Sequence, residues 1–324
     1  MIELKNDGLV VSFPEVHPQA TVTIELQRTL RVPDDGCSWP LPPGLGRFPV
    51  RHVDDFRNCV PRRWVEHGGV MVPVHQSEAL WLHFRSSGYP IALKVAAGKI
   101  NAVTGGGFSE GLSRWPQDYV VVPDQPWLDG YCVGQGLVRQ FVAVPLGSGL
   151  SAEEQITGRG DVGGLQVLAV PMKRSAYERR CGRPMPCAAG ASRSKSCGVA
   201  ECEDHADMGL APGGTLRQEL RVDPYDVDDW EQRVRSRCFV HLCNSQQWRA
   251  FTGSPPPTQP PNANDYRAHG LPWFESWSEP SSSLPGSSVL HDLRTVGPER
   301  RAVDEPRPRD LGSRGRWWVR EGEF

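Results

Sequence analysis

The sequence lacks an excess of charge of either sign. Its 36 lysines and arginines nearly balance 38 aspartates and glutamates, which gives a formal net charge of −2. A protein that binds nucleic acid or an anionic membrane through its overall field needs a clear basic excess. We therefore expect neither nucleic acid nor membrane among the partners of this chain.

Long apolar runs are also missing. No segment approaches the roughly 18 consecutive apolar residues that identify a membrane-spanning helix. The N-terminal stretch MIELKNDGLVVSF is interrupted by Glu3 and Asp7, so it lacks the basic start and the unbroken apolar region of a secretory signal. We expect a soluble, cytoplasmic protein whose nine cysteines are thiols rather than a disulfide framework.

Motifs that bind phosphate or carry a catalytic serine or zinc are absent as well. Gly98 and Lys99 resemble the end of a phosphate loop, but Leu93 stands where the first glycine is needed, and Ile100 replaces the magnesium-binding serine or threonine. Neither G-x-S-x-G nor H-E-x-x-H occurs. We predict no cofactor, and we interpret Gly98 and the glycines at 105–107 as hairpin turns.

Four cysteines and a histidine gather between Cys181 and His205. Structural zinc is usually held by two close pairs of ligands, because a tight turn can direct both sulfurs inward. The gaps here follow the pattern C-x5-C, C-x9-C and C-x4-C, so no pair has that spacing. We predict a loop of low order and no metal site.

The clearest strand pattern covers residues 21–32. Apolar residues such as Val22, Ile24 and Leu26 alternate with polar ones, which is typical of a half-buried strand. Residues 9–13 are a candidate for the strand that pairs with it. Further strand-like runs follow at short intervals, at 69–74, 79–84, 91–103, 119–122, 137–144 and 165–170.

Parallel pairing of these runs would require a crossover helix between most of them. The only helix signal in this part is a capping box, in which Ser151 is followed three residues later by Glu154. The sequence therefore predicts an α+β, β-dominated fold, with a mainly antiparallel sheet or sandwich body over residues 1–175 and a few short helices.

The composition changes after this body. Residues 176–214, rich in cysteine, glycine and serine, predict a mobile insertion, and residues 215–277 a mixed α/β segment packed on the body. Within that segment we expect an ordered stretch at 215–222, a strand at 237–243 and helices at 227–234, 245–252 and 262–269. Residues 278–324 predict a largely irregular tail.

Four polar residues interrupt the apolar strand patterns. Arg28 is the only charged residue on the apolar face of its strand, Lys94 divides IALKVAA, and Arg139 with Gln140 divides LVRQFVAV. A charge that faces a core must be paired or must line a cavity. The alternatives are buried ion pairs, with Glu25, Glu78 or an aspartate, and a pocket for a small polar or anionic ligand.

A second candidate site lies around the block QDYVVVPDQPWLDG. Trp127, Asp129 and two further acids, Asp118 and Asp124, belong to it. Trp115 and Tyr131 flank it. Aromatic rings beside carboxylates are typical of sugar sites, and paired acids can hydrolyse a glycosidic bond. Core aromatics with turn-forming aspartates explain the same pattern.

Cysteine and histidine residues form two candidate nucleophile pairs. His241 and Cys243 share a face of their predicted strand, and Cys59 is a candidate partner of His52 or His67. Ordinary packed side chains are the simpler interpretation of each pair.

Several blocks resemble a protein family of bacteria and some microbial eukaryotes that has no assigned activity. The most specific is QDYVVVPDQPWLDG, and QRTLRVPDDG and AHGLPWF are further examples. The resemblance covers most of residues 24–274 and the last six residues, and leaves out 179–205 and 280–316, which look like insertions. It implies a family and no mechanism.

Two functions fit these observations. Because no nucleophile, metal set or phosphate loop stands at the required spacing, the first is a noncatalytic cytosolic binding or structural protein. The alternative is a hydrolase-type enzyme with a polar cleft between the strands that carry Arg28, Lys94 and Arg139. These three residues, with Gln140, Trp127 and Asp129, are the predicted ligand-binding residues.

Overall fold

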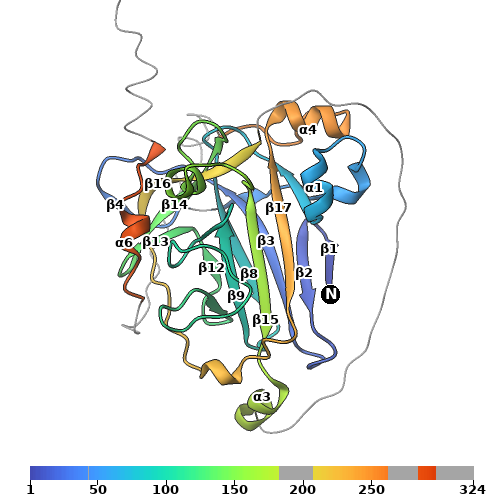
Figure 1. The fold of residues 1–324 in the computed structure, drawn as a ribbon, viewed down its shortest axis with the longest axis vertical. Coiled ribbons are helices and arrows are strands. Elements are labelled where there is room, and N and C mark those ends of the chain that lie inside the picture. Colours follow the sequence, from blue (N-terminus) through green and yellow to red (C-terminus); the bar gives the residue numbers. More distant parts are fainter. Residues whose placement is uncertain (43, 182–206, 262–283, 297–324) are drawn as a thin grey trace, which may run out of the picture.

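The computed structural model describes residues 1–42, 44–181, 207–261 and 284–296 (Figure 1). In these ranges the chain forms a β-dominated α+β fold with two sheets and a few short helices. The helical segments are η1 (Val53–Phe56), α1 (Arg62–His67), α2 (Ala152–Thr157), α3 (Arg174–Cys181), η2 (Val227–Asp229), α4 (Ser245–Thr252) and α6 (Ser288–His291).

Ten of the described strands form the first sheet, in the order β1-β2-β3-β8-β14-β16-β4, with β5, β12 and β13 paired to β3, β8 and β14. All pairs are antiparallel except β16 with β4. The strands are β1 (Ile2–Lys5), β2 (Gly8–Ser12), β3 (Thr21–Thr29), β4 (Ser38–Trp39), β5 (Gly44–Arg47), β8 (Ala79–Ser86), β12 (Trp127–Leu128), β13 (Gly130–Gly134), β14 (Leu137–Pro145) and β16 (Met208–Arg217).

The second sheet has the order β10-β9-β15-β17-β7-β6, with β11 paired to β9. Only β17 with β7 is parallel among its described pairs. Its strands are β6 (Arg51–His52), β7 (Val70–Pro73), β9 (Ile91–Ala97), β10 (Ile100–Asn101), β11 (Val120–Val122), β15 (Leu165–Pro171) and β17 (Ser236–Cys243).

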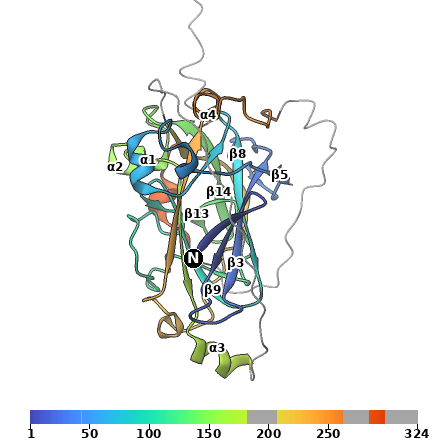
Figure 2. The same ribbon diagram turned by 90° about the vertical axis from the view of Figure 1, so that its right-hand side faces the viewer.

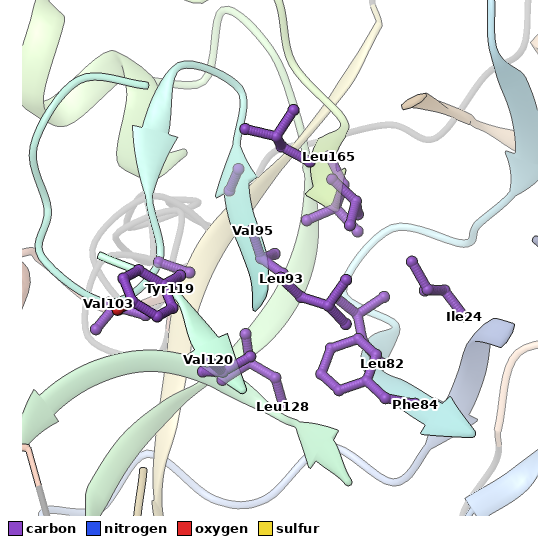
Figure 3. Packing of buried hydrophobic residues seen from close by; sticks show 14 of the residues in the cluster. Ile24, Leu82, Phe84, Leu93, Val95, Val103, Tyr119, Val120, Leu128 and Leu165 are labelled. Atoms are coloured by element: carbon purple, nitrogen blue, oxygen red, sulfur yellow. The ribbon is translucent and has the colours of Figure 1, made fainter. Parts of the chain in front are cut away.

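The largest hydrophobic cluster takes side chains from both sheets. Ile24, Leu82 and Phe84 come from β3 and β8 of the first sheet, and they pack near Leu93 and Val95 of β9 in the second (Figure 3). Burial of such side chains is the main favourable contribution to folding. The alternation along β3 and β8 leaves their other face polar, as expected for half-buried strands.

Three helices, α1, α3 and α4, lie at the two ends of the molecule. Figures 1 and 2 show α1 and α4 together at one end and α3 at the opposite end. Trp64 of α1 packs with Trp248 and Phe251 of α4 in a separate hydrophobic cluster. None of the helices in the described ranges is long and apolar enough to cross a membrane.

Several local predictions are confirmed. The strand β2 pairs with β3 as expected, and the turn at Gly98, with φ +56°, joins β9 to β10. The capping box of Ser151 and Glu154 begins α2. The helix predicted at 245–252 is present with the same bounds and ends at Gly253, which adopts the left-handed conformation.

The predicted boundaries after residue 175 differ from the structure. Helix α3 and the first part of β16 lie inside the predicted insertion, because β16 begins at Met208. The strand β16 pairs with β14 of the first sheet, and β17 lies inside the second sheet. Residues 208–243 thus complete both sheets rather than forming a segment packed on a finished body.

Two further predictions differ from the structure. We expected a helix at 227–234, but only the short η2 forms. The chain leaves the helix there because Trp230 pairs with Met172 and the carbonyl of Asp229 accepts a hydrogen bond from the main chain of Lys173. Part of the predicted irregular tail is packed, since Leu290 in α6 and Val296 are buried. The predicted helix at 262–269 and the cysteines at 187, 197 and 202 lie outside the described residues.

Candidate functional site

Arg28 lies at the end of β3, on the face that is turned toward the core. Its guanidinium nitrogen is 2.7 Å from a carboxylate oxygen of Glu78, whose side chain is 1% exposed. Arg28 also donates to the main-chain carbonyl of Gln259, and His75 lies 2.9 Å from the carbonyl of Thr258. The predicted ion pair with Glu78 is therefore present. Arg28 also helps to hold the proline-rich segment 255–261 against the first sheet.

Lys94 lies on β9 with its side chain fully buried. Its Nζ is 2.6 Å from a carboxylate oxygen of Asp118 and donates to the hydroxyl and carbonyl oxygens of Ser109, at 3.1 and 3.0 Å, and to the carbonyl of Gly111. Strand alternation turns Lys94 away from the core, into which Leu93 extends (Figure 3). Lys94 thus fastens the loop before β11 to the outer face of β9.

Arg139 and Gln140 bind main-chain groups of other segments. Arg139 donates to the carbonyl of Leu293 at 2.5 Å. The amide of Gln140 donates to the carbonyl of Leu30 at 2.9 Å and accepts from the main-chain nitrogen of Val32 at 3.0 Å. Both side chains replace the sheet hydrogen bonds that these irregular segments lack.

The three predicted cations are not brought together. Arg28 and Arg139 lie on strands of the first sheet and Lys94 on a strand of the second, and in the described residues no partner is shared among them. The predicted polar cleft required all three side chains to meet.

Asp129 is buried beside a glutamine. Its carboxylate accepts from the amide of Gln218 at 2.8 Å, and its main-chain nitrogen donates to the same side chain at 3.1 Å. Burial raises the pKa of Asp129 to about 7, against the opposing effect of the Gln218 hydrogen bond. A substantial fraction of the carboxyl is therefore protonated at neutral pH.

The aromatic residues and acids around the QDYVVVPDQPWLDG block occupy different places. Trp115 is 86% exposed, whereas Tyr131 is fully buried and donates to the carbonyl of Leu210 at 2.9 Å. Asp118 is engaged by Lys94. Trp127 alone of the predicted aromatics lies among further polar and aromatic side chains on the outer face of the first sheet.

The register of the first sheet assembles this outer face. Glu25 of β3 stands opposite His83 of β8, Gln27 stands opposite Trp81, and His83 stands opposite Trp127 of β12. Their neighbours in the chain, such as Leu26, Leu82 and Leu128, turn into the core. With Arg47 and Arg85, these residues form what we call the Trp–His surface: Glu25, Gln27, Arg47, Trp81, His83, Arg85 and Trp127.

Glu25 is the centre of the charges on the Trp–His surface. One carboxylate oxygen lies 2.8 Å from Arg47 and 3.2 Å from Arg85, and the other lies 3.1 Å from His83 and 3.2 Å from the amide of Gln27. Burial alone would raise the pKa of Glu25, but the His83 hydrogen bond and the charges of Arg47, His83 and Arg85 outweigh it and lower the pKa. Glu25 is therefore a stable anion that orients its neighbours.

The indole N–H groups of Trp81 and Trp127 on the Trp–His surface are buried without a hydrogen-bond acceptor among the described residues. The Nε1 atoms of Trp81 and Trp127 are out of contact with solvent, and neither has a hydrogen-bond partner in the part of the chain described here. Nearly all buried polar groups in proteins have a partner, and one left without costs about 1 to 3 kcal/mol. These two donors lie beside His83 on the outer face of the first sheet.

The predicted pair of His241 and Cys243 does not have reactive surroundings. Burial raises the pKa of Cys243 far above its ordinary value and lowers that of His241 to about 4. Low thiol pKa values and access to solvent are what make a cysteine nucleophilic. In the described ranges, moreover, no group of three or more histidine, cysteine, aspartate or glutamate side chains is placed to hold a metal.

Sequence reasoning missed most of the Trp–His surface. It named Trp127 as a site residue and Glu25 only as a possible ion-pair partner, and it did not name Trp81 or His83. The available signal was the outer alternation of EALWLHF, in which a tryptophan and a histidine occupy positions that face solvent in a half-buried strand. Several large aromatic side chains that gather on a solvent face mark a candidate binding surface.

Comparisons with known proteins add no identification. No family model, curated protein or solved structure matches this chain.

Proposed function

We propose that this chain is a noncatalytic binding protein, and that a small polar or anionic ligand contacts its Trp–His surface. The observation that carries this proposal is the pair of buried indole N–H groups of Trp81 and Trp127, which have no acceptor among the described residues. A ligand that supplies two acceptors removes the cost of both. His83, with 31% of its side chain exposed, lies between them on the same face.

A binding role fits the surface better than a catalytic one. Glu25 is surrounded by four donors, so it is poorly suited to take a proton from a substrate. The alternative, a hydrolase-type enzyme, requires a polar cleft formed by Arg28, Lys94 and Arg139. Each of these side chains instead binds a separate structural partner. No specific contact favours that alternative.

The setting of this function is part of the proposal. The shared core supports a description of the two sheets as a β-sandwich. We place the protein in the cytoplasm, where thiols such as Cys59 and Cys132 stay reduced. We also propose membership of the family that the block QDYVVVPDQPWLDG resembles.

Thermal denaturation in the presence of small ligands tests the proposal. The panel contains monosaccharides, nucleotides, small carboxylates and small phosphates, because a ligand of the folded state raises the melting temperature by mass action. We expect at least one class to raise it in the wild type and to lose most of its effect in a Trp81→Phe/Trp127→Phe variant, which keeps the rings but lacks both N–H donors.

Trp39→Phe is the matched control. The indole of Trp39 already donates to Asp35, at 3.2 Å, so the substitution removes one N–H group outside the surface. A ligand effect that vanished equally in this variant, or a panel that left the wild type unchanged, would contradict the proposed function.

A further inference from the structure

We infer that the Trp–His surface binds an oxyanion, a carboxylate or phosphate group, carried on a small flat apolar body. This inference rests on the proposed function and narrows its ligand class. It follows from the hydrogen-bonding capacity that the surface has left, from its charge and from the shape of its aromatic side chains.

The strong acceptor of the surface is already used. Each oxygen of Glu25 interacts with two donors, which are Arg47 and Arg85 at one oxygen and His83 and Gln27 at the other. A carboxylate has about four acceptor positions in total. Glu25 therefore has little capacity to accept a hydrogen bond from a ligand hydroxyl.

Donors, in contrast, are left without a partner. The two indole N–H groups are unpaired among the described residues, and because both are out of contact with solvent, a ligand reaches them only when the side chains around them move. A guanidinium group has five N–H donors, and Arg85 contacts Glu25 through one terminal nitrogen while its side chain is 61% exposed. The acceptors that remain, the side-chain oxygen of Gln27 and any ring nitrogen of His83 that carries no proton, are uncharged. The surface can thus donate more than it can accept.

The charge balance favours an anion. Arg47 and Arg85 carry two positive charges, and Glu25 neutralises one of them. Charge-assisted hydrogen bonds to an oxyanion are roughly twice as strong as neutral ones. A neutral sugar would need strong acceptors for its own hydroxyl groups, which this surface lacks.

The aromatic side chains indicate which group carries the oxyanion. The ring centroids of Trp81 and His83 are 5.5 Å apart, and Trp127 is opposite His83 on the neighbouring strand. The Trp81 ring packs so closely against the main chain of β5 at Gly44 that a Cβ atom added to this glycine would lie 3.3 Å from it. This contact restrains the indole. Restrained, partly exposed rings bind flat apolar groups through offset or edge contacts.

Isothermal titration calorimetry with four compounds tests the inference. Benzoate and phenyl phosphate carry the two oxyanions on the same ring, benzyl alcohol is the neutral ring and glucose the neutral polyol. We expect at least one anion to bind about tenfold more tightly than benzyl alcohol, which corresponds to about 1.4 kcal/mol. The comparison of benzoate with phenyl phosphate identifies which oxyanion is preferred.

Arginine variants locate the binding. We expect Arg85→Gln to weaken the preferred anion at least about fivefold, since one charge-assisted contact is lost, and to leave benzyl alcohol unchanged. Arg62→Gln changes the net charge equally at a side chain that is 92% exposed on α1, and should have no effect. Should Arg85→Gln not fold, which circular dichroism detects, Arg47→Gln replaces it.

The outcomes separate the two proposals. If benzyl alcohol or glucose binds as tightly as either anion, and does so only with Trp81 and Trp127 intact, the oxyanion inference is wrong while the binding function stands. If the preferred anion binds to Arg85→Gln, or to Arg47→Gln where that variant replaces it, as tightly as to the wild type, the inference is wrong about the site. If none of these compounds binds and the wider panel is also silent, both proposals fail.

Discussion

The ammonium nitrogen of Lys94 lies 2.6 Å from a carboxylate oxygen of Asp118, and the Lys94 side chain is fully buried. This ion pair links the outer face of β9 to the loop that carries Trp115. The main chain of the loop also depends on it, because Lys94 binds the carbonyls of Ser109 and Gly111. A lysine that interrupts an apolar strand pattern is thus explained by the loop that it fastens.

We predict that Lys94→Met destabilises the protein by about 3 to 5 kcal/mol, because it leaves the buried Asp118 carboxylate without its cation. Urea denaturation measures this change. Lys99→Met is the matched control, since the Lys99 to Asp161 pair is about half exposed and exposed pairs contribute about 1 kcal/mol or less. Equal stability of Lys94→Met and the wild type would contradict the structural role of the pair.

Gln140 should be as important as a core side chain. Gln140→Leu keeps the volume but leaves the carbonyl of Leu30 and the main-chain nitrogen of Val32 without their partner. We expect a loss of about 2 to 4 kcal/mol in the free energy of unfolding, since two buried main-chain groups lose their hydrogen bond. Gln246→Leu, at an exposed position of α4, should change it by less than about 0.5 kcal/mol.

Asp129 should make the protein less stable as the pH rises. Its pKa is raised from 3.8 to about 7 by burial, so the folded protein holds a proton that the unfolded chain releases. The favourable contribution is complete below pH 3.8 and is lost as the pH rises through about 7, and its full size is roughly 4 kcal/mol.

Asp129→Asn tests this linkage. The amide keeps an acceptor for Gln218 and cannot ionise, so the variant should be more stable than the wild type at pH 8, and this difference should shrink toward pH 4. Denaturation curves across this range measure it. A constant difference at every pH would show that Asp129 is not the group responsible.

His241 should make the protein less stable as the pH falls, which is the opposite of the effect of Asp129. Burial is the main cause that lowers its pKa from 6.5 to about 4, with His67 and Arg63 adding to the effect, and a hydrogen bond to Gly68 opposes it. The stability it contributes is complete above pH 6.5 and is lost as the pH falls through about 4, by roughly 3 kcal/mol. His241→Phe retains a ring against Trp64 and should remove this part of the acid sensitivity.

Local signals made part of the fold predictable. The strand at 21–29 alternates with period two, and the helices at 152–157 and 245–252 begin with capping residues and end at glycines. Each of these signals is contained in a few neighbouring residues. They could be recognised without any knowledge of the partner segments.

The strand β16 could not be recognised in this way. Its glycines suggest a loop, but a built Cβ at Gly214 would lie 2.3 Å from the carbonyl of Pro33, and one at Gly213 would lie 2.5 Å from the side chain of Val142. These glycines permit close packing inside the first sheet. The reason for their presence is a contact with distant residues, which the local sequence does not contain.

The candidate site was hidden for a similar reason. Trp127 was named because it lies in a distinctive block, whereas Trp81 and His83 are on the outer face of an ordinary strand. Their relation to Glu25 depends on the register between β3 and β8. The predicted cations do interrupt the strand pattern, but each of them binds a segment outside the regular strands, which is 255–261 for Arg28, the loop before β11 for Lys94 and the segment after α6 for Arg139.

Two-dimensional NMR of the indole N–H groups tests the binding function most directly. Trp→Phe variants assign the signals of Trp81, Trp127 and Trp39, and the protein is then titrated with benzoate, phenyl phosphate, benzyl alcohol and glucose. Binding at the Trp–His surface predicts that at least one compound shifts the Trp81 and Trp127 signals and leaves that of Trp39 in place. Signals of Trp81 and Trp127 that stay unchanged with every compound, or that move no more than that of Trp39, would contradict it.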